Sequence, residues 1–555
     1  MNSTGQERHE TPMDMDTGTR STDATEHHTD HHTEHDTEHD TGTAAAGDVE
    51  AALKGWRAAL GEARVRTDGP TLAAWQRNTS EFAPRELVAV LRPAGVSDVR
   101  QIIEVARSTK VLLQPVSTGR NWGFGSALPP RGPAALVQLG DMDRILKVDG
   151  RLGYAVIEPG VTQGRLSDHL AALGGTLKIN VTGSARETSL VGNVLDRGGG
   201  NLGARAADLL GLEVVLGNGE VVRTGLWHLD ADTVHHYPPG LGPDLLGLFV
   251  QSGFGVVTKM ALRLHPSRPL REVTVEVREP LLPDLVEELS AMCQDNLVTG
   301  YLRITDGADP NIRFFRASAT PTWKAQLTLY GNAGMRAAAA TEIEHRLSGL
   351  AESVQSFDTE HDDPAGCDEQ ERALLEARLQ LADGVPSDRS LHNLAQTAGK
   401  AWTGAPGDLD HDRDLPGFLC LNVTLPFTGS HVVTCAELVR RTAEEMGVTC
   451  ARLFGRIGPT ALSGFFPFYF ERTDPEAVAR AHRFKDELLD RLEAAAIYPM
   501  RIDIDVAPAF LRRTDDGFWR SVSAIKRALD PQGVVASRYV PEPSPATTPE
   551  SGEQE

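Results

Sequence analysis

Three short glycine-rich stretches in the first half of the chain constrain the fold more than any other feature. The first, PVSTGRNWGFG at 115–125, has three glycines in seven residues and directly follows the apolar run 111–113. The others are SLVGNVLDRGGG at 189–200 and QSGFG at 251–255. A glycine loop after a strand can turn its backbone N–H groups to one side, which suits an anion such as a cofactor pyrophosphate. The spacing GxxxGxG matches neither the GxGxxG dinucleotide fingerprint nor the P-loop.

The composition predicts an ordinary globular protein and excludes several partners. Hydrophobic residues make up 40% and charged residues 24% of the chain. The net charge of -22 argues against nucleic acid or an acidic membrane surface as a partner, because either would need clustered Lys and Arg. We find neither a membrane-spanning apolar run nor a signal peptide, so we expect a cytoplasmic protein. The preference for Arg over Lys, with abundant Ala and Gly, is typical of a GC-rich bacterial genome.

The two ends of the chain are predicted to be disordered. Residues 1–48 are rich in Thr, Asp, Glu and His without periodic apolar positions, and residues 546–555 are a short polar tail. Histidines recur among acidic residues in the first tail, at His27, His28, His31, His32, His35 and His39. These histidines could bind a transition metal, or they could simply belong to a solvated acidic tail. We expect no metal site in the ordered part.

The region from 49 to 270 alternates strands and helices. A helix from Val49 precedes a strand at 87–91 and a second helix, with Ser97 as its expected N-cap. That helix places apolar residues on one face, at Val99, Ile102, Ile103 and Ala106. The sequence GNG at 217–219 predicts a hairpin between strands at 213–216 and 220–222.

A second region begins near 270, where the glycine clusters end. Strands are expected at 327–330, 418–425 and 465–470, each followed by a helix, and Ser430 is the expected cap of the second of these helices. Repeated passes of strand and helix predict an antiparallel sheet with helices on one face.

These patterns together resemble a known family of flavoproteins. The three glycine stretches, the hairpin EVVLGNGEVVRTG, the segment GPDLLGLFVQSGFGVVTKM and the C-terminal LDPQGVVASRY occur in this order. In these motifs the chain is similar to the vanillyl-alcohol oxidase and p-cresol methylhydroxylase family. The resemblance implies an α+β fold. A two-subdomain PCMH-type FAD-binding domain, formed by 49–270 and 497–545, would surround a cap domain at 271–496 with an antiparallel, ferredoxin-like sheet.

The resemblance also implies which residues contact FAD. The first loop would wrap the pyrophosphate, the second would lie by the flavin, and the third would run beside the adenosine half. The implied contacts are Pro115, Ser117, Gly119, Arg120, Asn121, Trp122, Gly123, Ser189, Gly192, Asn193, Asp196, Gly253, Gly255, Val256, Val257 and Arg538.

Departures from the family pattern bear on the substrate. Members that oxidise para-alkylphenols hold the phenolate with two tyrosines and an arginine. Here Phe124 replaces the first tyrosine, and Tyr498 matches the second but is followed by Pro499. We therefore expect no phenolate site. Arg501, two residues beyond, is a candidate substitute for the arginine, and Asp208 is a candidate for the family's acidic residue near flavin N5.

The candidate catalytic residues are thus Tyr498, Arg501 and Asp208, and the candidate substrate pocket is Trp122, Phe124 and Tyr498. A tyrosine hydroxyl can orient or deprotonate a substrate, and an arginine can hold an anionic group. Alternatively, Tyr498 is a structural tyrosine and Arg501 a surface arginine.

The expected function is an FAD-dependent oxidase or dehydrogenase. It would pass a hydride to flavin N5 from a small alcohol, amine or activated C–H substrate, aromatic or not, with oxygen or another acceptor reoxidising the flavin. The positions that carry covalent flavin in the family hold no suitable His or Tyr here, so dissociable FAD is expected. Two alternatives stay open: a carbohydrate-type alcohol oxidase, and a flavin-binding protein without the chemistry. A homodimer is also left open.

Overall fold

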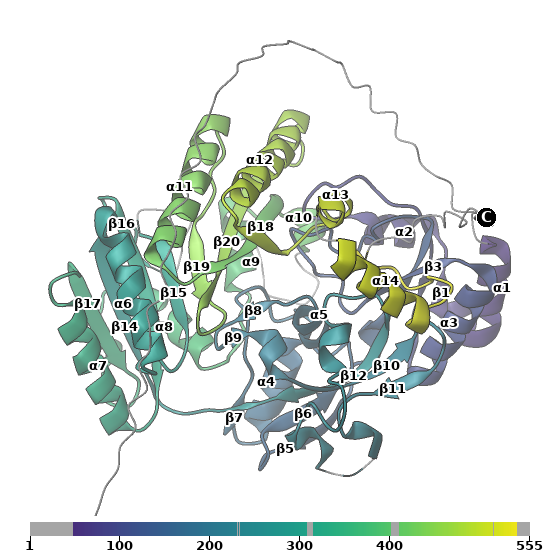
Figure 1. Cartoon of the computed structure of the whole chain (residues 1–555), viewed down its shortest axis with the longest axis horizontal. Coiled ribbons are helices and arrows are strands. Elements are labelled where there is room, and N and C mark those ends of the chain that lie inside the picture. Colours follow the sequence, from purple (N-terminus) through teal and green to yellow (C-terminus); the bar gives the residue numbers. More distant parts are fainter. Residues whose placement is uncertain are drawn as a thin grey trace, which may run out of the picture. The chain divides into compact units, whose positions relative to one another are not determined.

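The computed structural model describes residues 48–229, 231, 233–307, 315–400, 410–513 and 516–540 (Figure 1). The histidine-rich segment and both predicted tails therefore lie outside the described residues, apart from Asp48. Among the described helices, none combines the length and the apolar character needed to cross a bilayer. The described chain is built on three main sheets, two of them before residue 270.

The first sheet carries the first glycine loop. Its strands, in the order β1-β2-β4-β3, are β1 (Val65–Arg66), β2 (Leu87–Leu91), β4 (Ala134–Gln138) and β3 (Leu112–Val116). Strand β4 runs parallel to both β2 and β3, so the strand, helix and strand unit expected from the sequence is present. The accompanying helices are α1 (Val49–Leu60), α2 (Gly69–Gln76) and α3 (Val96–Thr109). Because β3 ends at Val116, the glycine loop begins at the carboxyl end of a parallel strand.

Helix α3 confirms its predicted buried face but not its predicted start. The four apolar residues from Val99 to Ala106 are fully buried, and they share a core with Trp56 of α1. The prediction of Ser97 as N-cap is wrong, because the helix begins at Val96 with Gly95 as the N-cap residue. Asp98 instead accepts a hydrogen bond from the N–H of Ala94. At the start of α3, the side chain that binds a backbone N–H is therefore that of Asp98, which lies in the first turn of the helix.

The second sheet is antiparallel, and the third glycine stretch leads into its strand β12. Its order is β11-β10-β12-β6-β5, with β11 (Val221–Arg223), β10 (Leu209–Leu216), β12 (Gly255–Arg263), β6 (Tyr154–Ile157) and β5 (Ile145–Asp149). The predicted hairpin is confirmed between β10 and β11, with Gly219 at a φ of 89°. Short helices α4 (Gln163–Ala172) and α5 (Leu190–Leu195) follow β6 along the chain. Two-stranded sheets are formed by β7 (Leu177–Lys178) with β13 (His265–Pro266) and by β8 (Gly199–Gly200) with β9 (Gly203–Ala204).

The third sheet has eight strands, and every pairing in it is antiparallel. The order is β17-β14-β16-β15-β19-β20-β18-β21. The bounds are β14 (Leu270–Arg278), β15 (Leu302–Asp306), β16 (Thr322–Tyr330), β17 (Ser353–Asp358), β18 (Gly417–Pro426), β19 (Leu453–Arg456), β20 (Ala461–Phe470) and β21 (Tyr498–Arg501). The expected α+β class with an antiparallel cap sheet is confirmed.

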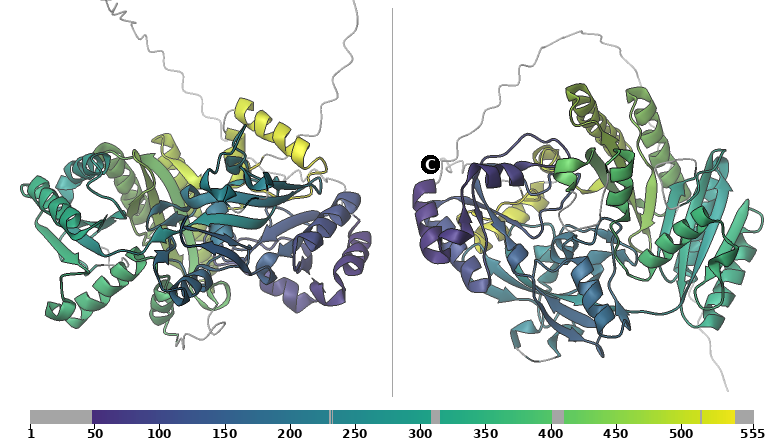
Figure 2. Two further views of the ribbon diagram at one scale, coloured as in Figure 1. Left: turned by 90° about the horizontal axis from the view of Figure 1, so that it is seen from below. Right: turned by 180° about the vertical axis from the view of Figure 1, so that it is seen from behind.

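Four helices share one hydrophobic core with this sheet (Figures 1 and 2). They are α6 (Leu282–Gln294), α7 (Ala333–Leu347), α11 (Gly429–Met446) and α12 (Pro475–Ala494). Alternation along β14 separates fully buried valines at 273, 275 and 277 from Glu272, which is bound by Arg378 of α8 (Glu369–Ala382). The prediction that Ser430 caps α11 is wrong, because the helix begins at Gly429 after the N-cap residue Thr428.

The remaining segments bring the C-terminal part of the chain to the first sheet. Helices α9 (Arg389–Thr397) and α10 (His411–Asp414) precede β18, and α13 (Ala507–Arg513) and α14 (Asp516–Leu529) follow β21. Beyond α14, Val535 forms a parallel bridge with Leu113 of β3. The N–H of Leu113 donates to the carbonyl of Val534 at 2.7 Å. The exact domain boundaries expected from the sequence stay predictions.

Candidate functional site

One cavity of about 240 Å³ joins all three glycine-rich stretches. Its wall also includes the C-terminal segment 535–539 and Arg501 of β21. Most of the residues that the resemblance assigned to FAD line it: Pro115, Ser117, Gly119, Arg120, Asn121, Ser189, Gly192, Asn193, Asp196, Gly253, Gly255, Val257 and Arg538. Segments separated by more than 400 residues therefore meet around one space.

Glycines at this cavity are required by close approach of neighbouring atoms. Gly119 has a φ of 73°, and a Cβ there would lie 2.7 Å from the ring of Trp75. A Cβ on Gly253 would lie 2.4 Å from Cβ of Ser537, so only glycine lets the third stretch lie against the C-terminal segment. The glycine pattern in the sequence thus reflects both backbone conformation and packing.

Asp196 forms a hydrogen-bonded ion pair in the cavity wall. Arg501 donates to its Oδ2 from Nε at 3.1 Å and also from Nη2, and Tyr539 donates its hydroxyl to Oδ1 at 2.6 Å. Nη2 of Arg501 also donates to Oδ1 of Asn121 at 2.7 Å, and its guanidinium lies 4.1 Å from the ring centroid of Phe124. Burial raises the pKa of Asp196, but the charges of Arg501 and Arg538 and the Tyr539 hydrogen bond outweigh it, so the pKa lies below its usual value.

A second carboxylate, that of Asp412 in α10, contacts the first glycine loop. Helix α10 is labelled in Figure 1. Asp412 accepts a hydrogen bond at Oδ1 from Oγ of Ser126 at 2.6 Å and one at Oδ2 from the indole N–H of Trp122 at 3.1 Å. Arg120 of the same loop donates to Asp410 at 3.1 Å. Removal from water raises the pKa of Asp412 to about 6, and the charge of Asp410 adds to this while the two hydrogen bonds and Arg120 oppose it.

Arg205 is a buried cation next to the cavity wall. It is 1% exposed, and its Nη1 donates to Oδ1 of Asn193 at 3.0 Å. Among the described residues, Nη2 of Arg205 has no hydrogen-bond partner. Burial lowers the pKa of Arg205 to about 10, and the charge of Asp208 raises it only in part. Asn193, which Arg205 binds, lines the cavity, whereas Arg205 itself does not, so this donor lies behind the cavity wall.

Several predicted site residues do not line the cavity. Trp122, Gly123 and Val256 are absent from its wall, and Phe124 is 3% exposed and packs with Phe418 and Cys420. Two of the three candidate catalytic residues also lie elsewhere.

Tyr498 and Asp208 have surroundings that differ from those of Arg501. Tyr498 is 52% exposed on β21 and is not part of the cavity wall. Asp208 is buried and accepts hydrogen bonds from Asn180 and His265, at 2.9 Å each. Of the three candidate catalytic residues, Arg501 alone lines the cavity, where it meets Asn121 and Asp196.

Sequence reasoning missed Tyr539, Ser126 and Asp412. Tyr539 directly follows Arg538, which was among the residues implied to bind FAD, so the same motif could have indicated it. Ser126 directly follows the glycine loop. Asp412 lies in a polar, acidic stretch without periodicity, and no local signal distinguishes it from its acidic neighbours.

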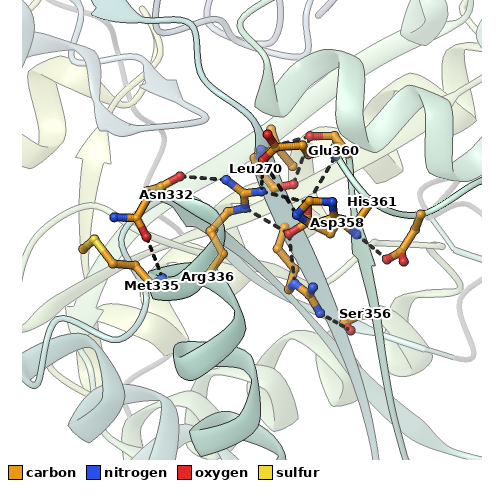
Figure 3. Close-up of polar contacts among 12 residues, drawn as sticks. Leu270, Asn332, Met335, Arg336, Ser356, Asp358, Glu360 and His361 are labelled. Carbon is orange, nitrogen blue, oxygen red and sulfur yellow. Dashed lines mark hydrogen bonds and ion pairs between the residues drawn. The ribbon is translucent and has the colours of Figure 1, made fainter.

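An acidic cluster on the cap sheet has the donor atoms of a metal site, but an arginine side chain binds them instead (Figure 3). Carboxylate and imidazole atoms of Asp358, Glu360 and His361 lie within 4.8 Å of one another. Arg336 donates to both oxygens of Asp358 at 2.9 Å and to Glu360 at 2.8 Å. Arg336 and Arg271, which also pairs with Asp358 at 3.2 Å, therefore already bind these carboxylates, and the cluster is an ion-pair network that ties α7 to the end of β17.

Comparison with known proteins gives matches to FAD-linked enzymes. Residues 88–225 match the family model described as an FAD binding domain. The chain is 30% identical over 540 residues to 1'-carboxy-chondrochloren decarboxylase of Chondromyces crocatus, covering 88% of this chain and 97% of that protein. It is 24% identical over 525 residues to the 4-cresol dehydrogenase [hydroxylating] flavoprotein subunit of Pseudomonas putida, covering 88% and 95%.

Solved structures show the same fold. The crystal structure of p-cresol methylhydroxylase with substrate bound superposes with a TM-score of 0.78 at 22% identity, covering 89% of this chain and 97% of that chain. The 4-ethylphenol oxidase of Gulosibacter chungangensis, in its isoeugenol complex, gives a TM-score of 0.79 at 23% identity, covering 90% and 99%. At these identities the likeness concerns the fold alone.

Proposed function

Because the chain belongs to the p-cresol methylhydroxylase and vanillyl-alcohol oxidase type of FAD-linked oxidoreductases, we propose that it removes a hydride from a small organic substrate. The substrate is an alcohol, an amine or a compound with an activated C–H bond. The acceptor is flavin N5, and oxygen or another electron acceptor reoxidises the flavin. The cavity shared by the three glycine stretches and the C-terminal segment is the observation that carries this proposal.

The residues around the cavity fit FAD. Backbone N–H groups of the loop 117–121 supply donors suited to a pyrophosphate, and Arg120, which pairs with Asp410 and Glu187, lines the cavity beside them. Nη2 of Arg205 supplies a further buried donor near Asn193. When bound, FAD supplies the acceptor for two electrons and leaves binding, orientation and exclusion of water to the protein.

An aromatic cluster packs against Arg501, which lines the cavity. Phe124, Phe418 and Cys420 form a buried cluster, against which Trp122 and Phe465 pack. Arg501 places its guanidinium against Phe124 while it holds Asn121 and Asp196. In the proposed role, this cation orients an oxygen of the substrate, and the aromatic cluster supports the cation from behind.

We also propose that FAD is held without a covalent bond. Among the described residues that line the cavity there is no histidine or cysteine, and Tyr539, which does line it, donates its hydroxyl to Asp196. Acid precipitation of the purified protein is expected to leave the yellow colour in the supernatant. Colour that stays in the pellet would contradict this proposal.

Anaerobic reduction of the flavin tests the function itself. The purified holoprotein is mixed with panels of simple alcohols, sugars, amines and alkyl aromatics, and loss of visible flavin absorbance is followed. We expect bleaching by at least one class, and slower bleaching when one particular C–H bond of the substrate carries deuterium would identify the broken bond. Absence of bleaching across all panels would favour the alternative of a flavin-binding protein without the chemistry, and bleaching by sugars alone would favour the carbohydrate-type alcohol oxidase.

A second candidate function is oxidation coupled to loss of a carboxylate from the substrate. It is favoured by the match over 97% of the length of a relative named as a decarboxylase. Release of carbon dioxide in step with flavin reduction by a carboxylic acid substrate would support it. Reduction without release of carbon dioxide would favour simple hydride removal.

The cytoplasmic location and the homodimer are not addressed by the geometry of the site. Both stay predictions, to be tested by cell fractionation and by light scattering of the purified protein.

A further inference from the structure

A hydrogen-bonded pair links the cavity to a carboxylate behind it. Ser126 lines the cavity, is 8% exposed, and donates from Oγ to Oδ1 of Asp412 at 2.6 Å. The second oxygen of Asp412 is occupied by the indole N–H of Trp122. Asp412 itself is not part of the cavity wall. The hydroxyl of Ser126 therefore links the cavity to this carboxylate.

The loop geometry holds Ser126 in this position. Its backbone has a φ of 49°, which is unusual for a residue other than glycine, and its N–H donates to the carbonyl of Asn121 at 3.0 Å. The next stretch, Ala127 and Leu128, is buried. With one carboxylate oxygen on Ser126 and the other on Trp122, Asp412 fixes both ends of the turn that contains Phe124.

We propose that Ser126 and Asp412 form the proton relay of this oxidoreductase, with Ser126 meeting the substrate and Asp412 receiving the proton as a positioning residue behind it. This inference rests on the proposed function and names its base. It differs from the sequence-based candidates, because Tyr498 and Asp208 do not line the cavity.

In the proposed reaction, one proton passes from the substrate to the Ser126–Asp412 pair and one hydride passes to FAD. A substrate O–H or N–H bond breaks and its proton forms a new bond to Oγ of Ser126, while the former hydroxyl proton of Ser126 moves to Oδ1 of Asp412. The electron pair of the neighbouring C–H bond leaves with hydrogen as a hydride to the FAD of the proposed function. The carboxylate becomes neutral, and the substrate gains a C=O or C=N bond.

The charges around Asp412 suit a group that gains and loses a proton near neutral pH. On α10, Asp410 pairs with Arg120, Arg413 pairs with Asp414, and burial lowers the pKa of His411 to about 3, so this imidazole is neutral. No cation forms an ion pair with Asp412 among the described residues. Its pKa of about 6 is close to the value expected of a base that works near pH 7.

The relay can be tested without a known substrate. Trp122 reports the protonation of Asp412 because its indole N–H donates to that carboxylate. In the full-length FAD-loaded protein, labelled with ¹⁵N on the indole, the signal of Trp122 is assigned with Trp122→Phe. We expect this signal to shift with a midpoint near pH 6, to lose the shift in Asp412→Asn, and to move its midpoint upward in Ser126→Ala, which removes one stabilising donor.

The control for the Trp122 titration is a variant of a carboxylate that lies outside the cavity wall. Asp368→Asn changes another cap carboxylate that accepts hydrogen bonds but does not line the cavity, and it should leave the titration unchanged. A Trp122 signal without a shift between pH 4.5 and about 7.5, or a midpoint unaffected by Ser126→Ala, would overturn the relay. Because Ser126→Ala retains the carboxylate, it decides the question even if Asp412→Asn fails to fold.

Kinetics then separate the relay from the proposed function. With any substrate that bleaches the flavin, the rate of flavin reduction should fall below about pH 6 in the wild type. Ser126→Ala and Asp412→Asn should each lower the rate at pH 7.5 by about 100-fold and abolish this limb, while substrate binding changes little. Normal reduction by both variants would overturn the relay and leave the proposed function intact. If no substrate bleaches the flavin, the proposed function fails and the Trp122 titration alone decides whether the pair exchanges a proton.

Discussion

Two carboxylates hold the same glycine loop from different sides, and their pKa values shift in opposite directions. Asp196 contacts the loop through Arg501, which also binds Asn121, and it accepts a hydrogen bond from Tyr539. Asp412 contacts the loop directly, through Ser126 and Trp122. Both are withdrawn from water, yet the pKa of Asp196 is lowered and that of Asp412 is raised to about 6.

The difference comes from the charge of the partners and not from burial. Burial opposes ionisation at both sites, but Asp196 faces two arginines, whereas the direct partners of Asp412 are a hydroxyl and an indole without net charge. An ionised carboxylate with a fixed cation is suited to holding structure. A carboxylate with neutral donors is suited to exchanging a proton.

Removing the cation of the first site should have the largest effect. Arg501→Met leaves Asp196 partly buried without its ion pair, since the side chains of both partners are 14% exposed. We expect the free energy of unfolding at pH 7 to fall by about 3 kcal/mol, measured by urea titration of the FAD-free protein. Affinity for FAD should also fall, because Arg501 holds Asn121 in the cavity wall.

Arg501→Lys is the matched variant for this prediction. It retains the positive charge but lacks the planar guanidinium that binds Asp196 and Asn121 together. The free energy of unfolding should therefore fall by less than in Arg501→Met. If the free energy of unfolding of Arg501→Met falls by less than about 1 kcal/mol, solvent already screens the ion pair of Arg501 and Asp196, as it does at the protein surface.

Neutralising the carboxylate of the first site should have a smaller effect with a defined pH dependence. Asp196→Asn keeps the shape and one acceptor, so we expect a loss of about 2 kcal/mol at pH 7. Since the folded-state pKa of Asp196 is lowered, its contribution is present above about pH 4 and disappears as the pH falls further. The difference between wild type and variant in urea titrations should therefore shrink below pH 4. A pH-independent difference would contradict the assignment.

The second site should show the opposite slope. Because the folded state raises the pKa of Asp412 to about 6, the folded protein holds this proton more tightly than the unfolded chain. Relative to Asp412→Asn, the wild type should therefore lose about 1 kcal/mol of stability between pH 4 and 6.5, a value reduced from the full shift for partial exposure. Parallel slopes for the Asp196 and Asp412 variants, in the same urea series, would refute the comparison between the two sites.

The sequence predicted the first of these sites better than the second. The glycine loops, the strands that precede them and Arg501 are local patterns: tight turns require glycine, buried strands require apolar runs, and a basic residue near Tyr498 stands out in an extended segment. The family resemblance that these motifs carry implied the α+β fold and FAD, and most of the implied FAD residues line one cavity.

The second site depends on a contact that no local pattern encodes. Asp412 meets Ser126 across 286 positions of the sequence, and a one-residue shift in α10 would place Arg413 there instead. Trp122 was predicted to contact the cofactor or the substrate, whereas its indole N–H donates to Asp412. The predicted starts of α3 and α11 were wrong for a related reason. Gly95 and Thr428 are the N-cap residues, although the nearby Ser97 and Ser430 have a higher intrinsic preference for that position.

The smallest effect concerns Arg120, a cation that lowers the pKa of Asp412 from a distance. Arg120 pairs with Asp410 and with Glu187 at 3.0 Å, and its charge favours ionised Asp412 without touching it. Arg120→Met should therefore raise the midpoint of the Trp122 titration by a few tenths of a pH unit, roughly what a partly screened charge produces. Glu187→Gln, which frees the same guanidinium from one acid, should lower the midpoint by a similar or smaller amount. Shifts of the same sign in both variants would mean that loop displacement, and not the charge of Arg120, controls Asp412.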